Sequence, residues 1–319
     1  MLNFPQPPKN YSSVFLDETD KPLPLKLDPR TRYAFFSTIA TGGKSLIKSC
    51  KDLHLSRFVC YKTLKPEFAD DEVEQQRLIR EARVSAMLQH PNTIPTYELG
   101  RDGQGHCYFT MKLVHGYTLR EILNYRERYD LIQLMEVVIQ IGHVLEYAHT
   151  HGVAHRDIKP ENILVGPYGE VVLLDWGLAK VWHPDGTADA DKEGVSSLIE
   201  DITITSMGKA QGTAHYMSPE QINRDPAIDH RTDLFSLGAV IYEVLCGKTP
   251  ANGEKLHEII ASVLNDVPGR PSAISRARVP PLLEEVALQC LQKNPQQRYQ
   301  TMGEVIRLLQ QDWRKDLLG

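Results

Sequence analysis

The apolar residues in the first third of the chain come in short groups. Phe35-Phe36, Leu46-Ile47 and Phe58-Val59 are separated by polar and turn residues, including Thr41-Gly42-Gly43. Short apolar groups divided by turn residues are typical of strands joined by hairpins. The pattern from residue 33 to residue 64 therefore predicts a small antiparallel sheet.

A helix and two further strands are expected next. Residues 70–88 begin with acidic side chains and then carry apolar ones at helical spacing, which indicates one amphipathic helix that Pro91 stops. Strands are expected at about 93–99 and 107–114, because the Asp102-Gly103-Gln104-Gly105 turn divides two β-like runs.

Helical periodicity dominates beyond Gly116. A short helix is predicted at 119–123 and a long amphipathic one at 132–151, closed by Gly152. Four more helices are expected, at 233–246, 256–264, 282–291 and 302–312. A strand-rich first third followed by a helix-rich remainder predicts an α+β protein with two lobes and a cleft between them.

Two segments lack such periodicity. The first 30 or so residues hold six prolines, which is typical of an extended arm. Residues 183–213 are polar, acidic and rich in Ser and Thr, so a long mobile surface loop is expected there.

Composition and charge narrow the class of protein. The 319 residues include 36 basic and 41 acidic ones, and this net charge of −5 argues against a nucleic-acid partner. The five scattered cysteines lack C-x-x-C spacing, which favours a reducing compartment and disfavours a zinc site. No apolar run reaches about 18 residues and the N-terminus is polar, so we expect a cytoplasmic chain without a membrane segment.

The strongest chemical signal is the stretch His-Arg-Asp-Ile-Lys-Pro-Glu-Asn at 155–162. It combines a carboxylate (Asp157), a cation (Lys159) and a side-chain amide (Asn162), and a second carboxylate, Asp175, follows a β-like run. A base, a cation and two oxygen ligands for a hard metal are the groups needed to transfer a phosphoryl group from a nucleotide to a hydroxyl.

Three motifs in order resemble the protein-kinase family: the catalytic loop at 155–162, the metal-binding triplet Asp175-Trp176-Gly177, and the end of the activation segment at Ser218-Pro219-Glu220. A lysine at the position of Lys159 resembles the serine/threonine branch of the family. The sequence around these motifs is similar to that of the bacterial, Hanks-type (eukaryotic-like) members. The resemblance implies the two-lobed protein-kinase fold, with a small β-rich N-lobe carrying one regulatory helix and a larger, mainly helical C-lobe.

The implied layout divides the chain as follows. A proline-rich extension at 1–32 precedes the kinase domain at 33–313, and a tail at 314–319 follows it. Within the domain we expect the N-lobe and hinge at 33–114, the C-lobe at 115–313 and the activation segment at 175–220.

The resemblance also implies roles for the catalytic residues. Asp157 would accept or orient the proton of the substrate hydroxyl, and Lys159 would neutralise charge on the transferring phosphoryl group. Thr213 resembles the residue that binds near these two. Asn162 and Asp175 would hold Mg²⁺, with Mn²⁺ as a second candidate metal.

ATP is the implied nucleotide. Lys62 would reach its α and β phosphates and pair with Glu81. The other expected nucleotide-binding residues are Gly42, Ile47, Cys60, Met111, Lys112, Val114 and Leu164. Cys60 replaces the usual Ala beside the adenine, so a slightly narrower slot is expected.

The phosphate-covering loop departs from the family pattern. The family's G-x-G-x-x-G-x-V aligns with residues 40–47, where only the middle glycine, Gly42, is kept. Ala40 and Ser45 give the backbone less freedom to close over phosphates. Together with Cys60 they support an alternative, a pseudokinase scaffold that binds nucleotide weakly. Five retained residues argue against it: Lys62, Glu81, Asp157, Asn162 and Asp175. A small-molecule phosphotransferase is a third reading, disfavoured by Lys159 and Arg298.

The resemblance further implies regulation and partners. Arg156 precedes the catalytic Asp, an arrangement that in the family accompanies control by activation-loop phosphorylation. The candidate sites for autophosphorylation are Thr203, Thr205, Ser206, Ser196 and Ser197. Protein substrates with Ser or Thr acceptors are implied, and homodimers are common among bacterial relatives.

Three structural roles are also implied. Glu220 and Arg298 would form a buried ion pair that anchors the activation segment, and Asp233 would hold the catalytic-loop backbone. Trp176 replaces the family's common Phe, and its larger ring is expected to favour one position of the metal-binding triplet.

Overall fold

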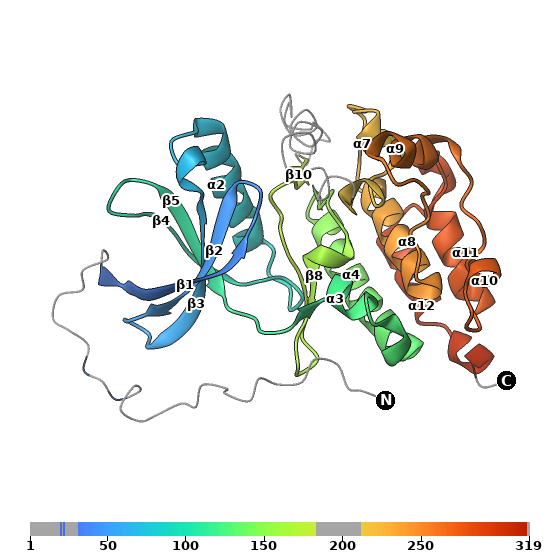
Figure 1. Ribbon diagram of the computed structural model, residues 1–319, viewed down its shortest axis with the longest axis horizontal. Coiled ribbons are helices and arrows are strands. Elements are labelled where there is room, and N and C mark those ends of the chain that lie inside the picture. Colours follow the sequence, from blue (N-terminus) through green and yellow to red (C-terminus); the bar gives the residue numbers. More distant parts are fainter. Residues whose placement is uncertain (1–19, 21, 23–30, 183–211, 318–319) are drawn as a thin grey trace. The chain divides into compact units, whose positions relative to one another are not determined.

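The computed structural model describes residues 20, 22, 31–182 and 212–317. These residues form two compact units (Figure 1). The small unit holds residues up to Gln89 together with Thr93–His115, and the large unit holds His90–Asn92 and the chain from Gly116 onward. Most of the expected arm, most of the expected 183–213 loop and all five candidate phosphorylation sites lie outside the described residues.

The small unit is built on one sheet with strand order β1-β2-β3-β5-β4, in which all neighbours are antiparallel. The strands are β1 (Tyr33–Thr41), β2 (Ser45–Asp52), β3 (Arg57–Leu64), β4 (Thr96–Arg101) and β5 (Cys107–Lys112). The predicted antiparallel sheet is confirmed. β5 ends at Lys112, two residues earlier than expected.

Helix α2 (Glu72–Met87) covers one face of this sheet. Its first turn is capped by Asp71, whose side chain accepts hydrogen bonds from the Val73 and Glu74 amides. Leu78 and Ala82 of the helix pack on Phe109 and other sheet residues. A second cluster, Cys50, Val59, Tyr61 and Tyr108, includes side chains of the opposite face, since successive strand residues alternate.

The large unit has a core of packed helices. The long helix α4 (Leu131–Thr150) contacts α8 (Arg231–Cys246) and α12 (Met302–Leu309), and α8 also packs against α11 (Pro281–Cys290) (Figure 1). Gly152, with φ of +72°, ends α4 in the left-handed conformation as expected. Other helices of the large unit are α3 (Leu119–Leu123), α7 (Pro219–Ile222), α9 (Leu256–Asn265), α10 (Pro271–Ile274), and the 3₁₀ helices η3 (Arg126–Arg128), η4 (Pro160–Asn162), η5 (Pro295–Gln297) and η6 (Trp313–Leu317). A further 3₁₀ helix, η2 (Pro66–Phe68), lies in the small unit.

Five short strands position the segments of chemical interest in the large unit. β6 (Tyr117–Thr118), β8 (Ile163–Val165) and β9 (Val171–Leu173) form one antiparallel sheet, and β7 (Val153–Ala154) pairs with β10 (Lys180–Val181). Residues 155–162 therefore run between β7 and β8, and Asp175 comes two residues after β9.

Among the described residues, α4 alone is long and apolar enough to span a membrane by length and composition. The same test is passed by core helices of soluble proteins, and 56% of its apolar window is buried inside this structure. The packing of α4 against α8 and α12 accounts for its apolar side chains. The length and apolar composition of α4 are therefore weak evidence for a membrane span.

Candidate active site

The backbone of the 155–162 segment is held by a buried carboxylate of α8. Asp233 accepts hydrogen bonds from the amides of His155 and Arg156, each at 2.8 Å, and its Oδ2 lies 2.8 Å from His149 Nε2. Burial alone would raise the pKa of Asp233, but its hydrogen bonds, that with His149 first, hold this pKa below the usual range. The expected role of Asp233 is confirmed, and the carboxylate stays ionised as an acceptor.

Arg156 adopts a left-handed backbone with φ of +66°. This conformation costs a residue with a Cβ about 1–2 kcal/mol. The contact with Asp233 and a 2.7 Å hydrogen bond from Arg156 Nε to the Leu178 carbonyl hold it in place. Asp157, the next residue, is buried.

Three of the residues expected in the active site, Lys159, Asn162 and Thr213, gather around Asp157. Lys159 Nζ lies 2.8 Å from both carboxylate oxygens of Asp157 and 3.0 Å from Thr213 Oγ1. Asn162 Nδ2 donates to the Asp157 carbonyl at 2.8 Å and to its Oδ2 at 2.9 Å. Burial would lower the pKa of Lys159, but the Asp157 carboxylate raises it above the ordinary value, so the ammonium stays charged.

Asp175 is attached to the same segment through its neighbours. The Leu174 amide donates to the Asn162 carbonyl at 2.8 Å, and His155 Nε2 lies 2.9 Å from the Leu174 carbonyl. Asp175 has a φ of +62°, and its charge contributes to the raised pKa of Lys159. Trp176, which is buried, places its ring edge-on to His155 at 4.6 Å between centroids.

Asn162 and Asp175 suit a magnesium ion. Because the Asn162 amide nitrogen faces Asp157, its amide oxygen is the acceptor left for a metal, and Asp175 offers a carboxylate. Mg²⁺ in nucleotide sites takes one or two protein ligands and completes its shell with phosphates and water. Among the described residues, no group of three or more His, Cys, Asp or Glu side chains is arranged to hold a metal ion by itself.

The expected pair of the small unit is present. Lys62 Nζ lies 2.5 Å from Glu81 Oε1, and both residues are buried. In the sheet, Ile47 is opposite Lys62 and Cys60 is opposite Met111, so these four side chains share one face. Burial raises the pKa of the Cys60 thiol to about 12, so Cys60 acts as a small apolar group.

The other expected nucleotide residues belong to other parts of the chain. Gly42 is in the β1–β2 turn, Lys112 is the last residue of β5, and Val114 follows it without regular structure. Leu164 belongs to the large unit, where it lies in β8 opposite Val172 and Thr118.

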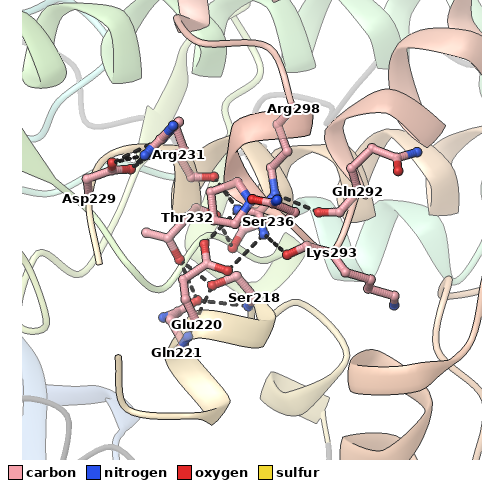
Figure 2. Close-up of polar contacts among 12 residues, drawn as sticks. Ser218, Glu220, Gln221, Asp229, Arg231, Thr232, Ser236, Gln292, Lys293 and Arg298 are labelled. Atoms are coloured by element: carbon pink, nitrogen blue, oxygen red, sulfur yellow. Dashed lines mark hydrogen bonds and ion pairs between the residues drawn. The ribbon is translucent and has the colours of Figure 1, made fainter. Parts of the chain in front are cut away.

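The buried ion pair between Glu220 and Arg298 is confirmed (Figure 2). The guanidinium donates to the two carboxylate oxygens at 2.6 and 2.8 Å and also to three backbone carbonyls, those of Gln292, Arg231 and Lys293. Next to Glu220, Gln221 Nε2 donates to the Arg156 carbonyl at 2.7 Å. The pair is therefore connected to the catalytic segment.

Comparison with known proteins agrees with this arrangement. The model of the protein kinase domain matches residues 33–313. The chain belongs to the protein kinase family.

Curated relatives of this kinase domain carry bacterial serine/threonine-kinase names. It is 33% identical over 275 residues to a probable serine/threonine-protein kinase of Clostridium acetobutylicum, covering 86% of the chain and 39% of the relative. It is 31% identical over 285 residues to PknD of Chlamydia caviae (85% and 30%) and 32% identical over 277 residues to PknB of Mycolicibacterium smegmatis (86% and 42%).

These findings place the kinase domain in the bacterial, Hanks-type serine/threonine branch. The names of the relatives give no support to the pseudokinase alternative. The chain spans between 30% and 42% of the length of these three relatives.

Sequence reasoning missed several contacts in the kinase domain. His149 lies against Asp233, 84 residues away, and nothing in its own helix indicates this partner. Lys44, in the turn of the phosphate-covering loop, forms an ion pair with Glu74 of α2. The one available signal was the position of Lys44 at the tip of a hairpin that lacks two of its expected glycines.

Proposed function

We propose that this domain transfers the γ-phosphoryl group of ATP to Ser and Thr hydroxyls of protein substrates. The observation that carries the proposal is the cluster of Asp157, Lys159, Asn162 and Thr213 around one carboxylate. In the proposed reaction this cluster would supply a base, a cation and a metal ligand already in position. Positioning and charge stabilisation supply most of the catalysis of phosphoryl transfer.

Each residue has a distinct task in the proposed reaction. Asp157 orients the acceptor hydroxyl and takes its proton, and Lys159 stays cationic to offset charge on the transferring group. Mg²⁺, or Mn²⁺, would be held by Asn162 and Asp175 and would shield the triphosphate charge.

The nucleotide is assigned to the residues that sequence analysis singled out. Lys62, held by Glu81, would bind the α and β phosphates. The other residues proposed to contact the adenine or to belong to the phosphate-covering loop are Gly42, Ile47, Cys60, Met111, Lys112, Val114 and Leu164. The shared sheet face of Ile47, Cys60, Lys62 and Met111 supports this assignment.

Regulation, location and assembly belong to the same proposal. Autophosphorylation in the 183–213 loop is expected to control activity. A cytoplasmic location is supported by the five cysteines, all of which are free thiols. A homodimer rests on the family resemblance alone, and sedimentation of the purified chain at micromolar concentration would reject it by showing only monomer.

The test is intact-mass analysis after incubation with ATP and Mg²⁺. We expect added phosphate that maps to the 183–213 loop, and a loss of at least about 100-fold in rate for Asp157→Asn. Asp312→Asn, an exposed carboxylate, is the matched control and should retain wild-type activity. Circular dichroism and thermal melting should show both variants folded.

Two outcomes would reject the proposal. If no phosphate is added at high ATP with either metal, the domain is a pseudokinase scaffold. If labelled phosphate reaches a small metabolite but never a protein, it is a small-molecule phosphotransferase.

A further inference from the structure

The phosphate-covering loop is fixed by its neighbours within the small unit. The Gly42 amide donates to the Ser45 carbonyl at 2.9 Å and closes the turn. The Lys65 amide donates to the Lys44 carbonyl at 2.9 Å, and Lys65 Nζ donates to the Gly43 carbonyl at 2.7 Å. Two consecutive carbonyls at the tip of the loop are thus bonded to the residue that follows β3.

A side-chain bridge ties the same tip to α2. Lys44 Nζ lies 2.8 Å from Glu74 Oε1, and Arg77 contacts that same oxygen at 2.5 Å. Glu74 is 7% exposed, so its carboxylate is largely removed from water and is compensated by two cations. The three side chains together carry a net charge of +1.

Glu74 and Glu81 lie on one stripe of α2. They are seven residues apart, which is two helical turns, so both project from the same face of the helix. Glu81 holds Lys62, and Glu74 holds the tip of the phosphate-covering loop. One helix face therefore fixes both the proposed phosphate-binding lysine and the loop.

We infer that Lys44 and Glu74 are positioning residues that hold the phosphate-covering loop in its nucleotide-binding form; this rests on the proposed function. Ala40 and Ser45 replace two glycines that would let the backbone adapt to phosphates. A loop that adapts poorly to phosphates can still bind nucleotide well if it already has the binding conformation in the free protein. The binding free energy is then not reduced by the entropy cost of ordering the loop. The bridge supplies that order.

The experiment is a charge swap read out by nucleotide binding. Calorimetry with a non-hydrolysable ATP analogue and Mg²⁺ would compare the wild-type chain, Lys44→Glu, Glu74→Lys and the double variant. We expect each single variant to bind roughly 3- to 10-fold more weakly and the double variant to return to within about twofold of wild type. The double variant restores the net charge of +1.

The two single variants separate positioning from simple attraction. Lys44→Glu lowers the local charge and Glu74→Lys raises it, so attraction of the polyanionic nucleotide alone would weaken the first and strengthen the second. Glu72→Lys, an exposed position in the same helix turn, makes the same charge change as Glu74→Lys and is the matched control. It should leave the affinity within about twofold of wild type.

Several results would overturn the inference. It fails if the single variants shift affinity in opposite directions, or if Lys44→Glu and the double variant are both weak while Glu74→Lys binds normally, since Lys44 would then contact phosphate itself. It also fails if the wild-type chain binds no nucleotide. If the swap behaves as expected but no phosphate is ever transferred, the inference stands and the proposed activity fails.

Discussion

The ion pair between Glu220 and Arg298 predicts that removing one partner destabilises the protein more than removing the other. Both side chains are buried, with 7% and 0% of the side chain exposed. Arg298 also donates to three backbone carbonyls, whereas Glu220 pairs with the guanidinium at both of its oxygens. Removing the arginine therefore breaks more hydrogen bonds than removing the carboxylate.

The magnitudes follow from those contacts. Breaking a buried pair from one side costs about 3–5 kcal/mol, and we expect Arg298→Met at or above the top of this range because three carbonyls also lose a donor. Glu220→Gln keeps one oxygen that accepts from Arg298, so about 2–3 kcal/mol is expected. Changing both to Met should cost less than Arg298→Met, because no charge then remains buried.

Urea unfolding at neutral pH measures these differences in the free energy of unfolding. They appear as shifts of the urea concentration at the midpoint, provided that the dependence of the free energy on urea concentration keeps the same slope. Arg270→Met is the control: its ion pair with Glu284 has 72% of the arginine side chain exposed, so a cost below about 1 kcal/mol is expected. Equal costs for Arg298→Met and Glu220→Gln, or a double variant less stable than both, would refute the argument.

Three further predictions concern the large unit. Gly238→Ala would place a Cβ 2.5 Å from the Cys290 Cβ and should lower stability by about 1–3 kcal/mol in urea unfolding, whereas a neutral result would mean that α8 and α11 can separate. Asp233→Asn should lower the free energy of unfolding at pH 7. The lowered pKa of Asp233 gives the wild type stability that is lost on protonation, so the wild type should lose stability as pH falls below about 4 and the variant should not. Melting temperatures of the two proteins that change in parallel with pH would contradict this. Burial lowers the pKa of His215, so the fold disfavours its protonation and stability falls as pH drops through about 6.5; His215→Asn should flatten that slope in thermal melts.

The sequence predicted the longer elements because their periodicity extends over several turns or strands. Helices α2, α4 and α8, the antiparallel sheet within residues 33–64 and the two strands after α2 were expected. The joining of all five strands in one sheet was not. β6, β7, β8, β10 and α10 were not, since two to four residues are too few to show a period. These short strands are nevertheless what positions residues 155–162.

The site divides in the same way. The residue types at 157, 159, 162 and 175 were predictable because their spacing is local and resembles a family pattern. The Lys44–Glu74 pair, 30 residues apart, and the His149–Asp233 pair, 84 apart, depend on how the elements pack and leave no local pattern. Nor did the sequence indicate the left-handed backbone at Arg156 and Asp175, where a glycine would have been the usual signal.

The packing of α4 has a consequence for how the domain folds during synthesis. The apolar faces that α4 presents are covered by α8 and by α12, and the latter begins about 150 residues after α4 ends. At about 5–20 residues per second, a ribosome needs roughly 8–30 seconds to make that intervening chain. For that time the 20-residue helix α4, whose buried face is mainly apolar, lacks its partner α12. We therefore expect the nascent chain to be a substrate for chaperones and a chain truncated before α12 to aggregate.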